Sequence, residues 1–181
     1  MMKKIFPCLL ALALLPTGVA AGVNENAITA FGVISDMEPE QNGAGAGMSA
    51  QFEWQENVFL DGRFLLGTYD DFDRAQLLLG GEWVDQVGKV AGYLGAHVGA
   101  DIFDDEDVTV DAFARLHYDV GFAATRGSWM RVGVAYDIKS SKRQGGLRLS
   151  WESRDVDFGY FLSGEFYEDE KNLFAGVRWR Y

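Results

Sequence analysis

The stretch LFAGVRWRY, residues 173–181, alternates strictly between two sets of positions. Apolar residues stand at every second position from Leu173 to Tyr181, and Gly176, Arg178 and Arg180 lie between them. Because successive side chains of a β-strand point to opposite faces, this period of two predicts a strand. The stretch ends on an aromatic residue, whereas the terminus of a soluble domain is usually polar and poorly ordered. We therefore expect these residues to belong to the folded structure.

The same alternation recurs along the chain and predicts ten strands in all. Glycine is abundant (22 residues), proline is scarce (3), and aromatic residues make up 14% of the sequence. An even number of strands of about 11 residues each suits tilted strands that cross a bilayer. The predicted strands cover residues 28–34, 46–55, 58–66, 74–83, 89–101, 110–119, 130–139, 147–152, 158–165 and 173–181.

The composition of the two faces favours a membrane barrel over a soluble sandwich. One face of each predicted strand carries Leu, Val, Ala and aromatic residues without charge, as a lipid-facing surface requires. The other face mixes Gly, Ser, Gln, His and both signs of charge, which suits a narrow lumen. Since lipid cannot satisfy the free backbone groups of a sheet edge, the sheet must close. The sequence predicts an all-β, antiparallel, transmembrane up-and-down β-barrel of ten strands, with eight as the alternative.

The charged side chains of the polar face are expected to form a network that plugs the lumen, because buried charges must be paired. Ten strands enclose little more than a side-chain-filled interior, so a wide pore is disfavoured. The predicted lumen network consists of Asp61, Arg63, Arg74, Glu82, His97, Asp111, Arg115, His117, Arg131, Glu152 and Arg178.

Aromatic residues near strand ends predict the two membrane boundaries, because amphipathic rings favour the membrane interface. If the first strand rises from the periplasm, Trp54, Trp83, Tyr118 and Trp151 all end descending strands and form one ring. Trp129 falls in the lumen register instead. A looser ring at the other boundary is predicted from Tyr69, Phe72, Tyr136 and Phe166. On that side we expect longer and mostly acidic connections at residues 36–45, 68–73, 101–109, 139–146 and 167–172.

The first residues are typical of a secretory signal peptide. Lys3 and Lys4 precede an apolar run at residues 5–15, which is too short for a membrane-spanning helix of roughly 20 residues. Small residues precede a cleavage site that we predict after Ala21. Residues 1–21 are therefore expected to be removed, and residues 22–181 to form the barrel in the bacterial outer membrane. The single cysteine, Cys8, lies inside the apolar run, so the mature chain has no disulfide.

The charge of the chain excludes one large class of partners. The formal net charge is −11, and removal of Lys3 and Lys4 makes it −13. This acidic balance argues against nucleic acid as a partner.

The end of the sequence resembles the C-terminal signal of bacterial outer-membrane barrels. Gly176, Trp179 and Tyr181 match the pattern of a glycine followed by aromatic or apolar residues three and five positions later, although Phe174 stands where a polar residue is expected. The resemblance implies recognition by the outer-membrane barrel assembly machinery. It also implies outer-membrane lipids and lipopolysaccharide as surroundings, and we expect a monomer.

The two histidines are the candidates for chemistry in the lumen. If the intervening hairpin turns near residues 104–106, His97 faces residues 111–115 and His117 faces residues 91–95. The two rings are then expected about 10 Å or more apart, which argues against a shared metal. Asp111 and Arg115 are the expected neighbours of His97. A catalytic alternative would use His97 as base and Ser163 as nucleophile, but no motif supports it.

The acidic run at residues 101–107 invites a calcium interpretation. It lacks the fixed glycine and distal glutamate of an EF-hand loop, so a solvated loop face is the expectation. Weak binding of divalent cations among lipopolysaccharide phosphates is the alternative. We predict no cofactor, no resident metal and no catalytic residue.

Three classes of function therefore stay open. The first is a barrel with a plugged lumen that serves envelope structure or surface interaction, and this is the class that we favour. The second is a narrow outer-membrane channel. The third is a lipid-modifying enzyme of the outer leaflet.

Overall fold

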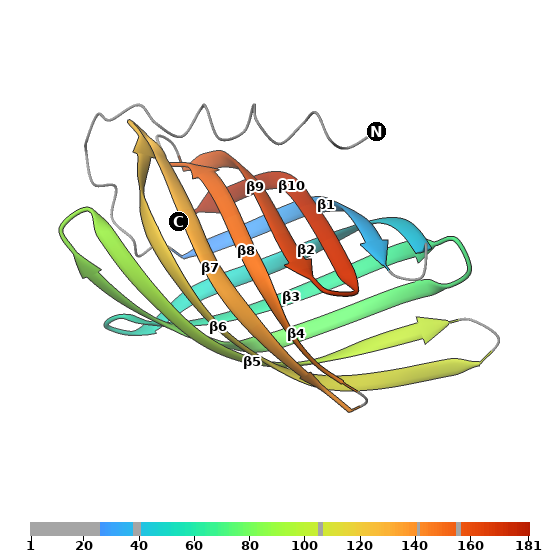
Figure 1. Cartoon of the computed structure of the whole chain (residues 1–181). Coiled ribbons are helices and arrows are strands. Elements are labelled where there is room, and N and C mark those ends of the chain that lie inside the picture. The colour runs from blue at the N-terminus through green and yellow to red at the C-terminus, as the bar shows by residue number, and fades with distance from the viewer. Residues whose placement is uncertain (1–25, 38–40, 105–106, 141, 155–156) are drawn as a thin grey trace.

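The computed structural model describes residues 26–37, 41–104, 107–140, 142–154 and 157–181, and within them it contains ten strands in one closed barrel (Figure 1). Each strand pairs antiparallel with the next in sequence, and the last pairs with the first. The described residues include no helix of the length and apolarity that crossing a membrane would take. The strands are β1 (Ala27–Met37), β2 (Gln41–Gln55), β3 (Val58–Tyr69), β4 (Asp73–Val87), β5 (Val90–Asp104), β6 (Val108–Thr125), β7 (Ser128–Lys139), β8 (Arg143–Ser153), β9 (Phe158–Tyr167) and β10 (Glu170–Arg180).

The predicted fold class, strand number and alternation are confirmed. In β5, Tyr93, His97 and Asp101 are buried in the lumen, whereas Leu94 and Val98 are exposed on the outside. The other strands follow the same pattern, so the apolar side chains form the outer surface. A surface of this kind is suited to lipid. The predicted signal peptide and its cleavage site lie outside the described residues.

Tight turns join the strands at one end of the barrel. Asn57, Gly88 and Gly127 have φ values of 65°, 64° and 70°, a conformation in which glycine and asparagine are the most tolerated residues. These turns follow β2, β4 and β6, and we call this end the turn end. The opposite end, where β3, β5, β7 and β9 finish, is called the loop end.

The prediction of long connections at the loop end is wrong. β2 already begins at Gln41, β5 runs on to Asp104, and β10 begins at Glu170. The glycines of β2 gave a turn-like composition to a stretch that is strand, and Gly43, Gly45 and Gly47 occupy its inward positions. Asp101, predicted as the last residue of one strand and the first of an acidic connection, is a buried residue of β5 with 0% exposure.

An apolar cluster fills the lumen beside the closure between β1 and β10. It contains Phe31, Val33, Leu65 and Phe174, with Phe161 packed against them. The Phe31 ring meets the Phe161 and Phe174 rings edge-on, with centroids 6.2 and 5.6 Å away. Consequently one side of the lumen is apolar.

A second apolar cluster lies near the turn end. It contains Phe59, Val84, Ala91, Tyr93 and Trp129. Trp129 is 1% exposed, in agreement with its predicted lumen register. The two clusters leave the rest of the lumen to charged side chains.

Candidate functional site

The charged side chains of the lumen form several groups, and the first lies at the loop end. Arg74 on β4 contacts Asp101 on β5 at 2.8 Å and Glu170 on β10 at 2.6 Å. Lys139 lies 3.4 Å from the same Asp101. Because β4 and β10 are on different sides of the barrel, the Arg74–Glu170 pair joins the lumen across its width.

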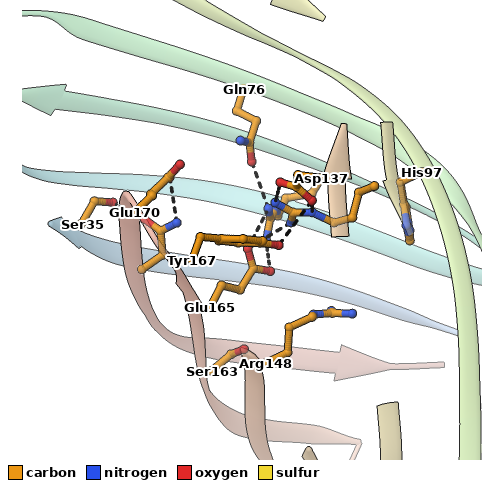
Figure 2. A network of polar contacts seen from close by, with 12 residues as sticks. Ser35, Gln76, His97, Asp137, Arg148, Ser163, Glu165, Tyr167 and Glu170 are labelled. Carbon is orange, nitrogen blue, oxygen red and sulfur yellow. Dashed lines mark hydrogen bonds and ion pairs between the residues drawn. The ribbon is translucent and has the colours of Figure 1, made fainter. Parts of the chain in front are cut away.

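A second group lies next to the first, on the side towards the turn end. The Arg115 guanidinium donates two hydrogen bonds of 2.7 Å to Asp137 and a third of 3.0 Å to Glu165. Arg63 donates to the other oxygen of Glu165 at 3.0 Å. Figure 2 shows this cluster together with Tyr167, whose ring lies 5.1 Å from the Arg115 guanidinium carbon. Bidentate pairs of this kind are the strong ones, because both partners are charged and the geometry is fixed.

The middle of the lumen holds a third group around Glu82. Arg131 bonds Glu82 and also Asp119, the latter at 2.8 Å. His117 Nε2 lies 2.9 Å from Glu82, and Arg148 lies 3.1 Å from Asp119. Glu82 and Asp119 are therefore each shared by two basic side chains.

The two histidines stack on one another, contrary to the prediction that they lie about 10 Å apart. Their ring centroids are 5.2 Å apart, with 20° between the ring planes. The predicted strand register is correct, since His97 pairs with Arg115 and His117 pairs with Gly95. The prediction of distance failed because each ring leans sideways over a glycine of the preceding strand. His97 lies over Gly80, where a Cβ would be 2.5 Å from its ring.

Each leaning ring reaches a carboxylate two strands away. His97 Nε2 lies 2.8 Å from Asp61, and Asp61, Gly80 and His97 are partners across β3, β4 and β5. Glu82, Gly95 and His117 repeat this arrangement on β4, β5 and β6. The lumen thus contains two acid–glycine–histidine rows side by side.

A fourth group lies at the turn end. Glu152 on β8 contacts Arg178 at 3.2 Å and Arg180 at 3.1 Å, and it also pairs with Arg154. Arg178 donates a further hydrogen bond of 2.6 Å to Gln51. One carboxylate of β8 therefore joins three guanidinium groups at this end.

The predicted network residue Asp111 lies elsewhere. It faces Asp101 in the register of β5 and β6, and it accepts a hydrogen bond of 2.6 Å from Ser140 at the exposed loop end. The prediction that Asp111 neighbours His97 is therefore wrong. The remaining predicted residues line or fill the lumen: Asp61, Arg63, Arg74, Glu82, His97, Arg115, His117, Arg131, Glu152 and Arg178.

The predicted lumen network leaves out several acidic partners. Asp101, Asp119, Asp137, Glu165 and Glu170 are all buried and all ion-paired. Four of these five stand in the polar register of their predicted strands, so alternation alone could have included them. Glu170 lies in the predicted connection 167–172, and only the actual start of β10 brings it into the lumen.

The predicted interface aromatics point outward. Trp54, Trp83, Tyr118 and Trp151 are 66%, 49%, 50% and 38% exposed. β4 continues to Val87 and β6 to Thr125, so Trp83 and Tyr118 lie within strands and not at strand ends. Tyr69, predicted for the other ring, is instead buried in the lumen beside Arg74.

The residues of the predicted assembly signal occupy both faces of β10. Trp179 and Tyr181 are exposed on the outside, with ring centroids 5.3 Å apart. Gly176 faces the lumen and pairs with Phe31 of β1. A Cβ at Gly176 would lie 2.7 Å from the Phe31 Cα.

The lumen contains side chains of the kinds that bind metal ions or act as nucleophiles, but their contacts in this structure favour neither role. Donor atoms of Glu82, His117 and Asp119 lie within 4.8 Å of one another. The Arg131 guanidinium already bonds both carboxylates, so a cation occupies that position. Ser163, the nucleophile of the catalytic alternative, donates its hydroxyl hydrogen bond to the Leu149 carbonyl at 3.2 Å.

Comparison with known proteins identifies the fold. No protein-family model and no curated protein sequence matches the chain. The β domain of the Bordetella autotransporter BrkA is similar in structure with a TM-score of 0.56 and 14% identity, over 87% of this chain and 99% of that one. The N-terminal barrel of Pseudomonas aeruginosa OprF has a TM-score of 0.47 and 8% identity, over 87% and 98% of the two chains. The KdgM porin has a TM-score of 0.45 and 9% identity, over 86% and 99%. The chain has the fold of a bacterial outer-membrane β-barrel.

Proposed function

We propose that the chain is an outer-membrane barrel with a plugged lumen, which serves envelope structure or surface interaction and carries out no catalysis. The observation that carries the proposal is the pair of buried ion-pair groups at opposite ends of the lumen. Arg74, Asp101 and Glu170 join strands at the loop end, and Glu152 with Arg178 and Arg180 joins strands at the turn end. A solute could pass only if these pairs separated, and separation would leave buried charges without a partner. The cost of that separation opposes the passage of solutes.

A narrow channel is the second candidate, and one observation favours it. A cavity of about 190 Å³ lies in the lumen between the two end groups and is lined by Arg63, Arg131 and Arg148 among others. A cavity of this size holds on the order of six water molecules. Movement at both ends would turn this cavity into a path for small ions.

Planar-bilayer conductance separates the two candidates. We expect the wild-type barrel to be silent. Arg74→Ala and Glu152→Ala, each alone, should also be silent, because each leaves the group at the other end in place. The double variant should give stable openings, since both ends then lose their cross-lumen pairs. The matched control combines Arg143→Ala and Glu168→Ala, which change exposed side chains and should stay silent. Large stable openings in the wild type would favour the channel.

The location of the protein is part of the same proposal. The fold supports the outer membrane, and the assembly machinery, the outer-membrane lipids and lipopolysaccharide are the partners that this location supplies. Protein purified from an outer-membrane fraction should have the intact mass of residues 22–181. A mass that includes residues 1–21, or recovery in the soluble periplasm, would contradict the proposal.

A further inference from the structure

Five arginines surround the cavity between the two end groups of the lumen. Arg63, Arg115, Arg131, Arg148 and Arg178 line it from β3, β6, β7, β8 and β10. Its other wall contains the aromatic side chains of the closure cluster. A guanidinium group presents five N–H donors in a fixed fork that matches carboxylate and phosphate oxygens. The cavity is therefore rich in donors for an anion.

The carboxylates of the lumen do not use all of these donors, because they are shared. Glu165 serves both Arg63 and Arg115, and Asp119 serves both Arg131 and Arg148. Three donor atoms stay without a hydrogen-bond partner in the described part of the chain although they are buried. They are Arg63 Nε, Arg148 Nη1 and Arg178 Nε.

Arg148 is the most available of the five. Its Nη1 lies 3.1 Å from Asp119, yet the pair lacks hydrogen-bond geometry. A buried donor left without a partner costs free energy, and a bound acceptor removes that cost.

The acidic side chains that line the cavity already contact basic partners. Asp61 contacts His97, Glu82 contacts Arg131 and His117, and Glu165 contacts two arginines. An incoming anion would consequently meet guanidinium groups beside carboxylates that already have a basic partner. Ser49 and Ser150 add hydroxyl groups to the lining of the cavity.

We propose that this cavity binds a small free oxyanion of the phosphate, sulfate or carboxylate class, with Arg148 as its principal ligand. Arg63 and Arg178 line the neighbouring walls and add positive charge to the cavity. The strands of the barrel enclose the cavity, so the headgroup of a bilayer lipid does not reach it. The site does not require conduction, because a small anion can enter past one end group while the group at the other end stays closed.

The test is a titration of the purified full-length barrel with inorganic phosphate in an uncharged detergent, at constant ionic strength set with chloride. We expect saturable stabilisation, seen as a rise of about 3 °C or more in the melting temperature. Arg148→Gln should raise the apparent dissociation constant for phosphate about tenfold, since a bidentate charged contact is lost. Arg148→Lys, which keeps the charge without the fork, should fall between the two.

The matched control is Arg143→Gln, which removes an exposed arginine from the start of the same strand and should bind phosphate as the wild type does. A wild-type barrel without saturable stabilisation would overturn the proposal. So would equal phosphate affinity in the Arg148→Gln variant, or stabilisation that appears only after anionic lipid is added. The wild-type titration decides the matter even if a variant fails to fold.

Discussion

At the scale of single residues, glycine positions decide how the lumen is filled. Gly80 and Gly95 lie between a histidine and a carboxylate in the register of the sheet. A Cβ at Gly95 would lie 2.1 Å from the His117 ring, so only glycine lets the ring lie flat against the wall. This is the sheet device in which a side chain covers a neighbouring glycine. The histidines can therefore stack in the middle of the lumen, where each reaches an acid.

The ion-pair partners could not be predicted from the sequence, although the face of each strand could. A period of two assigns a side chain to the lumen, and register then assigns its direct neighbour, as with His97 and Arg115. The pairs that matter most, however, join strands that are not neighbours. Arg115 on β6 bonds Glu165 on β9, and Arg74 on β4 bonds Glu170 on β10. Only the curvature of the closed sheet sets these distances.

Arg115 provides the sharpest stability prediction among the lumen residues. Its removal leaves Asp137 without its bidentate partner and deprives Glu165 of one of two arginines. Breaking a buried pair from one side costs about 3–5 kcal/mol, so Arg115→Ala should lower the melting temperature by on the order of 10 °C. Thermal unfolding followed by circular dichroism measures the shift. The exposed control Arg143→Ala should melt as the wild type does, and equal melting of both variants would contradict the role of the network.

At the scale of elements, β10 combines two duties on its two faces. Its outward face ends in Trp179 and Tyr181, which are exposed and packed against one another. Its inward face supplies Glu170, Asn172, Phe174 and Arg178 to the lumen. The sequence predicted this strand and its two faces, because the alternation there is strict. Because Trp179 and Tyr181 point outward, their side chains are accessible for recognition by the assembly machinery.

Replacement of the two terminal aromatics tests that recognition. Trp179→Ser with Tyr181→Ser should greatly reduce the yield of folded barrel in the outer membrane, and unfolded chain should collect in the periplasm. The physical reason is that the assembly machinery is expected to read exposed side chains of the last strand. Fractionation and a gel that compares boiled with unboiled samples measure both pools. Asp107→Ser with Glu168→Ser, which changes two exposed loop-end acids, is the control. Normal yields from the aromatic double variant would rule this recognition out.

At the scale of the whole molecule, closure between β1 and β10 removes the free edges of the sheet. All eleven residues of β1 pair with β10 on one side and with β2 on the other. In lipid an open edge leaves backbone groups unsatisfied, and this penalty makes closure a condition of stability. The Phe31 ring sits at this seam, and Gly47 and Gly176 flank it in the register. The two glycines thus leave space for the Phe31 ring where the barrel closes.

Gly176→Val should therefore prevent closure, independently of any recognition by the assembly machinery. A Cβ at Gly176 would lie 2.1 Å from the Ala30 carbonyl oxygen and 2.8 Å from the Phe161 ring, and the backbone atom cannot move without breaking the β1–β10 ladder. Refolding of the purified chain into detergent micelles, without any assembly factor, should give no heat-modifiable band for this variant. Gly145→Val is the matched control, because a Cβ at Gly145 meets nothing within 4 Å. A Gly176→Val chain that refolds as well as the control would show that this glycine serves recognition alone. Failure of refolding only in Gly176→Val assigns the glycine to the seam itself.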